Sequence, residues 1–211
     1  MDPHTSIERL IQFAYQRLKP KHFKVEDYGY TILFRLAAGS RCLESVIGTL
    51  EHSVLLGEQE VQIRLIKESE SLLFHLAGAF EAFGQLLNLV LRFEMPEASS
   101  KLRGKSVTGV SFKKVSAALG GSKFRSSQLA LVINESAFTA LVSDLFGARD
   151  QVTHRKLLDY SAVQGASGWK PYVNVNDTSM PLVPYLRDML ERTNSHLEKA
   201  LTATVSSVTG G

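Results

Sequence analysis

Cysteine and uninterrupted hydrophobic runs are scarce in this sequence, and each scarcity excludes a class of protein. Cys42 is the only cysteine among 211 residues, which excludes a disulfide framework and a zinc site built from thiolates. The longest apolar stretch, from Leu72 to Phe93, carries too many polar side chains at mid-depth for a simple membrane span. Asp2 stands before any apolar run, so no secretory signal is visible. We therefore expect a soluble, cytoplasmic protein with no membrane partner.

The motifs of metal- and cofactor-dependent enzymes are also missing. The sequence has no Gly-rich phosphate loop, no His-Glu-x-x-His pair, no EF-hand loop and no nucleophile elbow. The Glu-x-x-His spacing of di-iron helical bundles does not occur, and no two of the six histidines lie within one helical turn of each other. We therefore expect neither a metal nor a cofactor.

Acidic residues are absent from one long segment, Ser99 to Asn134. The chain carries a formal charge of +3, but this segment holds seven Lys and Arg, which leaves −4 for the remainder. A run of like charge is commonly a solvated loop. Clustered cations also release counterions from a polyanion, so the second interpretation is RNA binding. The RNA-binding candidates are Lys101, Arg103, Lys105, Lys113, Lys114, Lys123 and Arg125.

Apolar residues recur every three to four positions along most of the chain, which predicts long amphipathic helices. In the predicted helix at about 127–160, the apolar residues Leu131, Phe138, Leu145 and Val152 repeat every seven positions, which marks a packed seam. Glycine, proline and an alternation of apolar and polar residues indicate an irregular loop or small hairpin over 162–180. The predicted helices span about 6–19, 27–56, 58–93, 127–160 and 183–206, with one or two further turns near 115–119.

These elements predict an all-α fold, an antiparallel helical bundle of four to five helices. A basic loop and a small irregular or hairpin insertion precede the last helix. We expect a single domain over 1–211, with its core at about 27–160 and a C-terminal helix at about 183–206.

Three side chains allow two interpretations each. Phe112 and Phe124, inside the basic segment, either stack on bases or anchor the segment in the core, and we expect anchoring. Glu81 is the only acid in the Leu-rich part of the third helix. It either reaches a cleft of the bundle or faces solvent, and we expect the solvent-facing position.

One constellation has the chemistry to act on a phosphodiester: Arg149, Asp150 and His154, late in the fourth helix. Imidazole moves protons near neutral pH, and guanidinium stabilises phosphate charge. Asp150 lies four residues before His154, close enough on a helix to orient the ring. The other interpretation is an exposed helix end with local ion pairs. On a regular helix Arg149 and His154 point about 140° apart, so a shared target requires a bulge, a surrounding cleft or a second protomer.

An Arg, a polar residue and a His five positions after the Arg, late in a long helix, resemble the hallmark of the HEPN superfamily. A second match, Arg17 and His22, flanks Pro20 where the first helix ends and so has the wrong setting. The resemblance covers about 27–160 and the last helix. The insertion at 162–180 departs from the simplest members of the family.

The resemblance implies a HEPN-like, metal-independent endoribonuclease that works as a homodimer, as toxins and phage-defence effectors of the family do. RNA is then the substrate, and an antitoxin is a further partner. Arg149, Asp150 and His154 become the catalytic residues, which promote attack by the neighbouring 2′-hydroxyl. Two other functions stay open: a non-catalytic helical module that binds nucleotide, RNA or a protein, and a purely structural oligomerisation bundle.

Overall fold

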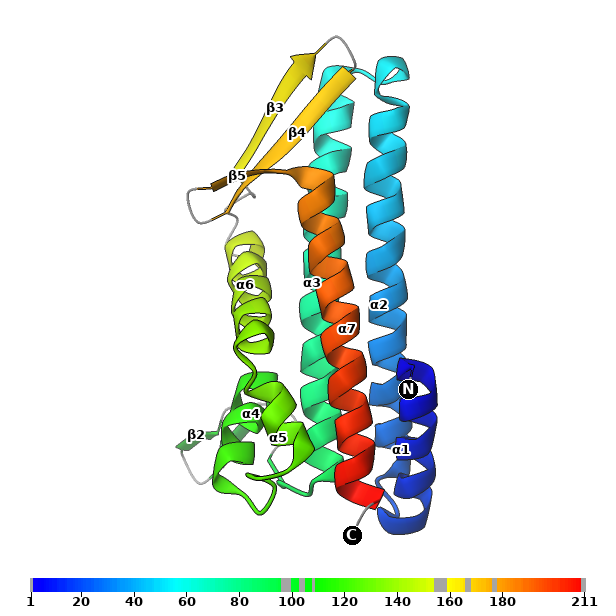
Figure 1. Ribbon diagram of the computed structural model, residues 1–211, viewed down its shortest axis with the longest axis vertical. Helices are drawn as coiled ribbons and strands as arrows, with labels where there is room; N and C mark the ends of the chain where they lie inside the picture. Colours follow the sequence, from blue (N-terminus) through cyan, green and yellow to red (C-terminus); the bar gives the residue numbers. More distant parts are fainter. Residues whose placement is uncertain are drawn as a thin grey trace. The chain divides into compact units, whose positions relative to one another are not determined.

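A computed structural model describes residues 2–95, 100–102, 105–107, 109–153, 159–165, 168–175 and 178–209. The described chain is predominantly helical, as predicted (Figure 1). Its helices are α1 (Pro3–Arg17), α2 (His22–Glu51), the 3-10 turn η1 (Ser53–Leu55), α3 (Glu58–Val90), α4 (Phe112–Gly121), α5 (Gln128–Ile133), α6 (Ser136–Thr153) and α7 (Leu182–Thr209). Its strands are β1 (Ser100–Leu102), β2 (Lys105–Val107), β3 (Asp159–Gly165), β4 (Gly168–Val175) and β5 (Thr178–Pro181).

The chain forms two compact units that share its longest helices. Unit 1 contains residues 1–34, 78–140 and 195–211, and unit 2 contains residues 35–77 and 141–194. Helices α2, α3 and α7 each contribute one part to each unit. The expectation of a single domain over 1–211 stays a prediction.

Short polar residues start several of the helices. The Asp2 carboxylate accepts a hydrogen bond from the Thr5 backbone N–H at 3.0 Å, and Pro3 opens α1. Ser111 caps α4 and Ser127 caps α5 in the same way, with their hydroxyls accepting from the N–H groups of Lys114 and Ala130. These caps satisfy backbone donors that have no partner within the helix, and each contributes about 1 kcal/mol.

A cluster of aromatic side chains lies in the core of unit 1. The Phe112 ring, at the start of α4, lies 5.5 Å from Phe80, 6.0 Å from Phe83 and 6.0 Å from Phe138 between ring centroids. Phe138 in turn meets the ring of His196 on α7 at 5.2 Å. This cluster joins α3, α4, α6 and α7 within the unit. Phe112 is 3% exposed, which confirms that it anchors the basic segment in the core.

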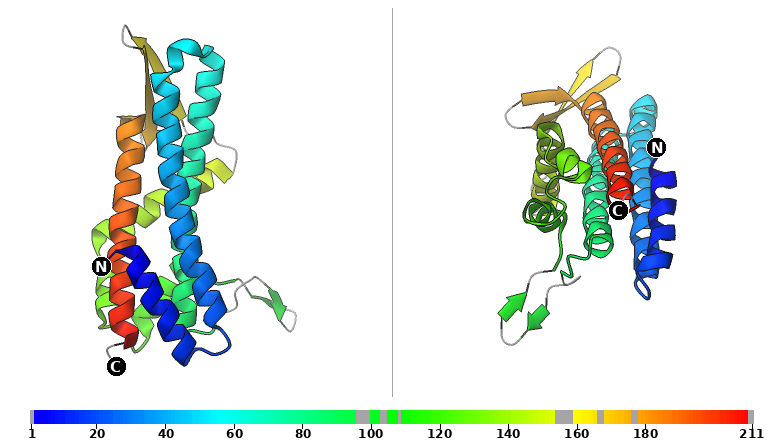
Figure 2. Two further views of the ribbon diagram at one scale, coloured as in Figure 1. Left: turned by 90° about the vertical axis from the view of Figure 1, so that its right-hand side faces the viewer. Right: turned by 60° about the horizontal axis from the view of Figure 1, so that its bottom comes forward.

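Helix α1 belongs to the same unit. Ile7 lies directly against Gly29 of α2, and the two helices run side by side (Figures 1 and 2). On its other side the Ser6 hydroxyl lies 3.4 Å from the hydroxyl of Thr202 on α7. The apolar face of α1 is fully buried at Ile7, Leu10 and Ala14, so its polar residues face outward.

Unit 2 contains a small antiparallel sheet as well as helices. Strands β3, β4 and β5 pair in sequence order, with Tyr160 opposite Val173 and Val173 opposite Met180. Val173 is fully buried. The segment predicted as an irregular loop or small hairpin is therefore a regular three-stranded meander. In the helical part of this unit, Leu76 of α3 and Leu190 of α7 both pack on Gly39 of α2.

The prediction of one continuous helix from Ser126 or Ser127 to Tyr160 is wrong at two places. Asn134 closes α5 by donating its backbone N–H to the Ala130 carbonyl, and α6 begins only at Ser136. This break changes the phase of the predicted seam: Leu131 is 61% exposed, whereas Phe138 and Leu145 are fully buried. At the other end, α6 is described as far as Thr153, and Asp159 and Tyr160 pair with β4 instead of continuing a helix.

The basic segment, predicted to be largely irregular, contains the hairpin β1–β2 and helices α4 and α5 in its described part. Among the described residues, one helix, α3, has the length and composition to cross a membrane. Within its most apolar window 72% of the residues are buried inside the protein, as in the core helix of a soluble protein.

Candidate functional site

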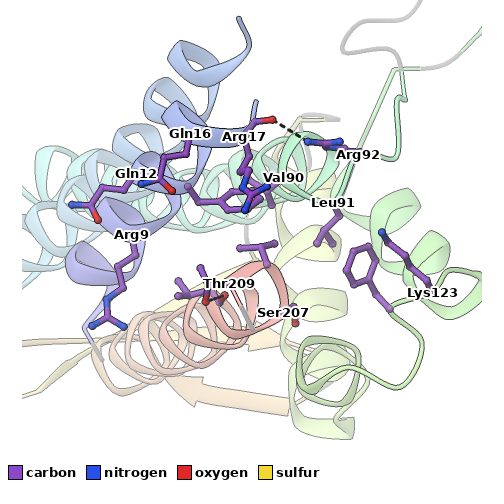
Figure 3. Close-up of a pocket in the computed structure, with 14 residues that line it drawn as sticks. Arg9, Gln12, Gln16, Arg17, Val90, Leu91, Arg92, Lys123, Ser207 and Thr209 are labelled. Atoms are coloured by element: carbon purple, nitrogen blue, oxygen red, sulfur yellow. Dashed lines mark hydrogen bonds between the residues drawn. The ribbon is translucent and has the colours of Figure 1, made fainter. Parts of the chain in front are cut away.

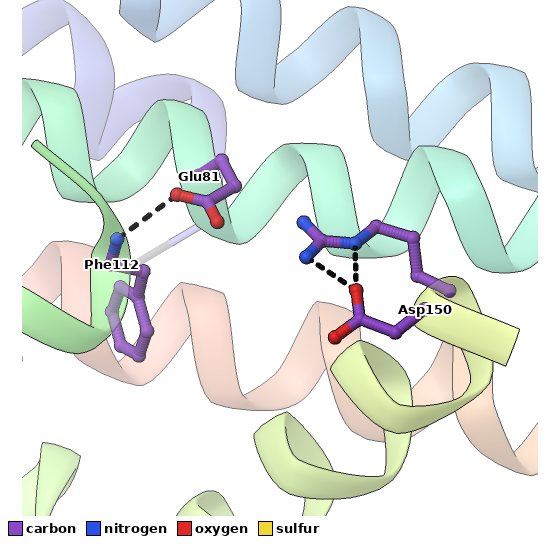
Figure 4. Close-up of polar contacts among 4 residues, drawn as sticks. Glu81, Phe112 and Asp150 are labelled. Atoms are coloured by element: carbon purple, nitrogen blue, oxygen red, sulfur yellow. Dashed lines mark hydrogen bonds and ion pairs between the residues drawn. The ribbon is translucent and has the colours of Figure 1, made fainter. Parts of the chain in front are cut away.

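Arg149 lies on the last turns of α6, where two neighbours hold its guanidinium. Its Nε and Nη2 atoms both donate to Oδ1 of Asp150, at 3.1 and 2.8 Å (Figure 4). The guanidinium carbon lies 4.6 Å from the ring centroid of Phe146, within the range of a cation–π contact. His154, the third residue of the predicted catalytic set, lies outside the described residues.

The pair of Arg149 and Asp150 is locally neutral. The Asp150 carboxylate compensates the guanidinium charge at contact distance, so the pair by itself has little attraction for a polyanion. Its geometry matches the other interpretation of Arg149 and Asp150, an exposed helix end with local ion pairs. The predicted catalytic roles stay predictions.

The sequence-predicted RNA-binding residues have different surroundings. Lys101 and Lys105 lie on β1 and β2, and Arg103 lies outside the described residues. Lys114 donates from Nζ to the Gly109 carbonyl at 2.6 Å, so its ammonium group supports the entry to α4. Lys113 and Arg125 are exposed to solvent.

Lys123 differs from these residues because it lines a pocket. Its Nζ lies 5.2 Å from the ring centroid of the half-buried Phe124. Both residues border a concavity of about 830 Å³ in unit 1, which we call the basic pocket (Figure 3). The residues that line it are Arg9, Gln12, Phe13, Gln16, Arg17, Val90, Leu91, Arg92, Lys123, Phe124, Val205, Ser207, Val208 and Thr209.

The outward face of α1 supplies one wall of the basic pocket. Arg9, Gln12, Gln16 and Arg17 are all exposed and follow the helical spacing of three, four and seven to eight residues. Figure 3 shows these four side chains along one side of the pocket, with Ser207 and Thr209 of α7 across from them. The burial of the apolar face of α1 therefore directs its polar face into the pocket.

The end of α3 supplies the third arginine, in an unusual backbone conformation. The N–H of Phe93 donates to the Asn88 carbonyl and that of Arg92 to the Leu89 carbonyl. This is the Schellman closure of a helix, whose left-handed position is usually glycine. Arg92 occupies that position with a φ of 57°, which costs about 1–2 kcal/mol for a residue with a Cβ atom.

The Arg92 side chain is held as well. Its Nη2 donates to the backbone carbonyl of Arg17 at 2.9 Å and so links the end of α3 to the end of α1. The buried Asn88 amide binds both the N–H and the carbonyl of Met95, each at 3.0 Å, which fixes the chain after the helix. Arg92 is therefore positioned from both its backbone and its side chain.

The charge of the basic pocket is uncompensated along its lining. Arg9, Arg17, Arg92 and Lys123 contribute four cationic side chains, and none of the described residues that line the pocket is Asp or Glu. A concave surface with one sign of charge concentrates the field and attracts ions of opposite charge. The amide and hydroxyl groups of Gln12, Gln16 and Thr209 add hydrogen-bonding capacity.

Sequence reasoning missed three of these four cations. Arg17 belongs to the second Arg–His match, whose setting beside Pro20 at the end of a helix is wrong for the HEPN hallmark. The His22 ring of that match packs against the rings of Tyr15 and Phe23, with centroids 4.3 and 3.9 Å apart. Arg9 and Arg92 carry no local signal, because a polar helix face and a helix end are ordinarily solvated.

Glu81 corrects another expectation. Its Oε2 accepts a hydrogen bond from the Phe112 backbone N–H at 3.0 Å and is partly buried (Figure 4). The carboxylate therefore holds the start of α4 on α3 within unit 1, and the predicted solvent-facing position is wrong.

Two further titratable groups, Cys42 and His75, have pKa values shifted by burial. Burial, with the neighbouring Glu68 as the second cause, raises the pKa of the Cys42 thiol to about 11, so it stays protonated at neutral pH. Burial and then the charges of Arg35 and Arg41 lower the pKa of His75. Among the described residues, no group of three or more His, Cys, Asp and Glu side chains is placed to hold a metal ion.

Comparisons with known proteins assign no family to this fold. No protein-family model matches the chain, and the searches of curated proteins and of solved structures find no similar protein.

Proposed function

We propose that this protein binds RNA through the basic pocket of unit 1. The observation that carries the proposal is the lining of the pocket: four cations from three separate parts of the chain with no carboxylate among the described lining residues. Phosphate groups provide the charge that such a surface lacks, and their binding releases condensed counterions.

Other features of the pocket favour RNA over a simple inorganic anion. Its volume of about 830 Å³ is that of a pocket for an organic ligand of substantial size. The half-buried Phe124 ring lies beside Lys123 at the border of the pocket and offers a stacking surface for a base. Gln12, Gln16 and Ser207 provide donors and acceptors for phosphate and ribose oxygens.

The first prediction compares two lysines of the basic segment. Lys123→Ala is expected to weaken binding of a fluorescein-labelled single-stranded RNA 12-mer about three- to fivefold and to lower the salt slope by about 0.7, since one phosphate contact is lost. Lys113→Ala removes the same charge from α4 but not from the pocket, so it is expected to leave both values near those of the wild type. Fluorescence anisotropy from 50 to 200 mM KCl measures the two effects. Equal losses in both variants would assign RNA binding to a diffuse basic surface instead of the pocket.

A second candidate function is metal-independent RNA cleavage of the HEPN type. It rests on the resemblance of Arg149, Asp150 and His154 to the HEPN hallmark; the Asp150 carboxylate holds the Arg149 guanidinium by two hydrogen bonds. In this scheme Arg149 binds and stabilises the phosphorane, and His154 serves as general base or general acid. Asp150 orients one of these two side chains. This second proposal includes an antiparallel bundle of four to five helices that forms a homodimer in the cytoplasm. Its biological role is that of a toxin or defence effector with an antitoxin partner.

Cleavage is tested in EDTA on a long single-stranded RNA. If it occurs, Arg149→Ala and His154→Ala are each expected to lower its rate by at least about a hundredfold, with unchanged thermal unfolding and unchanged RNA affinity. The products are expected to end in cyclic phosphates. An intact RNA after incubation with the wild-type protein, or full cleavage by both variants, rejects this second function and leaves the binding proposal untouched.

A further inference from the structure

The basic pocket has a neighbour that shares two of its residues. A second concavity of about 590 Å³ in unit 1 lies around the ends of α1 and α3. It is lined by Arg17, Leu18, Lys19, Lys21, Asn88, Leu89, Arg92, Glu94 and Met95. Arg17 and Arg92 line both concavities, so these two side chains form the border between them.

The charge continues across this shared border. Lys19 and Lys21 are exposed and add two cations, while Glu94 is the only carboxylate among the described lining residues. The hydrogen bond from Arg92 to the Arg17 carbonyl keeps the border in place, and the left-handed φ values of Arg92 and Glu94 shape the turn beneath it. A non-glycine residue in this conformation costs about 1–2 kcal/mol, and such strain concentrates at binding sites.

Two joined concavities select for a ligand that is long and thin. A mononucleotide fills only one of them and leaves the lysines of the other without an anion. A double helix is too broad to enter a pocket of this size, whereas an unpaired strand carries a phosphate at every residue and is flexible enough to follow both. We propose that the two concavities form one track for an unpaired RNA strand, with its phosphates in both concavities and Arg17 and Arg92 at the centre.

This inference rests on the proposed RNA binding and adds the strand type and the length of the bound segment. Its test compares a uridine trinucleotide and a uridine nonanucleotide, each measured by displacement of the labelled 12-mer. Lys19→Ala/Lys21→Ala is expected to weaken the nonanucleotide about tenfold and lower its salt slope by about 1.4, since two phosphate contacts are lost. The trinucleotide, held in the basic pocket alone, is expected to keep its affinity within about twofold.

Lys113→Ala/Lys199→Ala is the matched control, because both lysines are exposed, lie outside the two concavities and change the net charge equally. If the control weakens the nonanucleotide as much as Lys19→Ala/Lys21→Ala does, the track is rejected. Equal losses for the two RNA lengths reject it too, as does a blunt RNA duplex of nine pairs that binds as tightly as the single strand. Equal affinity for inorganic polyphosphate would show that the track recognises phosphate alone. Whichever of these outcomes is found, the effect of Lys123→Ala on RNA affinity tests the proposed function separately.

Discussion

Replacing Gly84 by alanine is expected to lower the free energy of unfolding by about 3 kcal/mol, the upper part of the range for overpacked sites. A Cβ atom at this position would lie 2.7 Å from the Cα and 2.9 Å from the nitrogen of Phe112. Both are backbone atoms, and the Phe112 N–H is bound to Glu81, so the start of α4 has to move as a whole. That movement displaces the Phe112 ring from its contacts with Phe80 and Phe138.

Urea unfolding followed by circular dichroism measures this loss. The matched control is Gly48→Ala, a change within α2 where no atom lies within 4 Å of the added Cβ. It is expected to stabilise the protein by up to about 1 kcal/mol, because alanine restricts the unfolded chain and favours the helix. If Gly84→Ala is as stable as Gly48→Ala, the close packing of α4 on α3 is incorrect.

The double variant Arg17→Ala/Arg92→Gly is expected to lower the affinity for single-stranded RNA about thirty- to a hundredfold at low salt, with a salt slope reduced by about 1.4 or more. It removes the two cations that line both concavities. Anisotropy titrations against KCl concentration measure the effect. Arg64→Ala/Arg187→Ala removes two exposed arginines from elsewhere in the chain and is expected to change the affinity less than threefold.

Measuring the free energy of unfolding distinguishes a direct loss of RNA affinity from a loss caused by unfolding of the variant. Glycine at position 92 relieves the left-handed strain, about 1–2 kcal/mol, while the lost hydrogen bond to the Arg17 carbonyl costs about 1 kcal/mol. The Arg92→Gly variant is therefore expected to unfold within about 1 kcal/mol of the wild type even as its RNA affinity falls. A clear loss of stability together with unchanged affinity would mean that Arg92 serves the fold and not the ligand.

Local patterns predicted the helical class and several helix ends. Helix α3 begins at Glu58 as predicted and ends at Val90, three residues before the predicted end at Phe93. The prediction of one unbroken helix, suggested by the seven-residue repeat from Leu131 to Val152, failed at Asn134, where α5 ends, and at Asp159 and Tyr160, which lie on β3. A seven-residue repeat does not show whether its members lie on the same continuous helix. Because α5 ends at Asn134 and a new helix follows, Leu131 is exposed to solvent whereas Phe138 is buried in the core.

The candidate site was predicted only in part, for a related reason. The segment around Lys123 and Phe124 lacks acidic residues, a property of neighbouring positions that the sequence shows directly. The basic pocket joins them to Arg9, Arg17 and Arg92, which lie as many as 115 positions away along the chain. Nothing in the local sequence distinguishes these arginines from solvated ones.

The sequence by itself determined that this protein is mainly helical, that its charge is concentrated between Ser99 and Asn134, and that its motifs include no familiar metal or cofactor site. These are properties of composition and short-range periodicity. Only the tertiary structure decided which cations share a surface, because packing of the apolar face of α1 and the Schellman closure after α3 set the directions of Arg9, Arg17 and Arg92. The close approach of α4 to Gly84 was likewise decided by packing, since the contact between two segments depends on their geometry and not on either sequence alone.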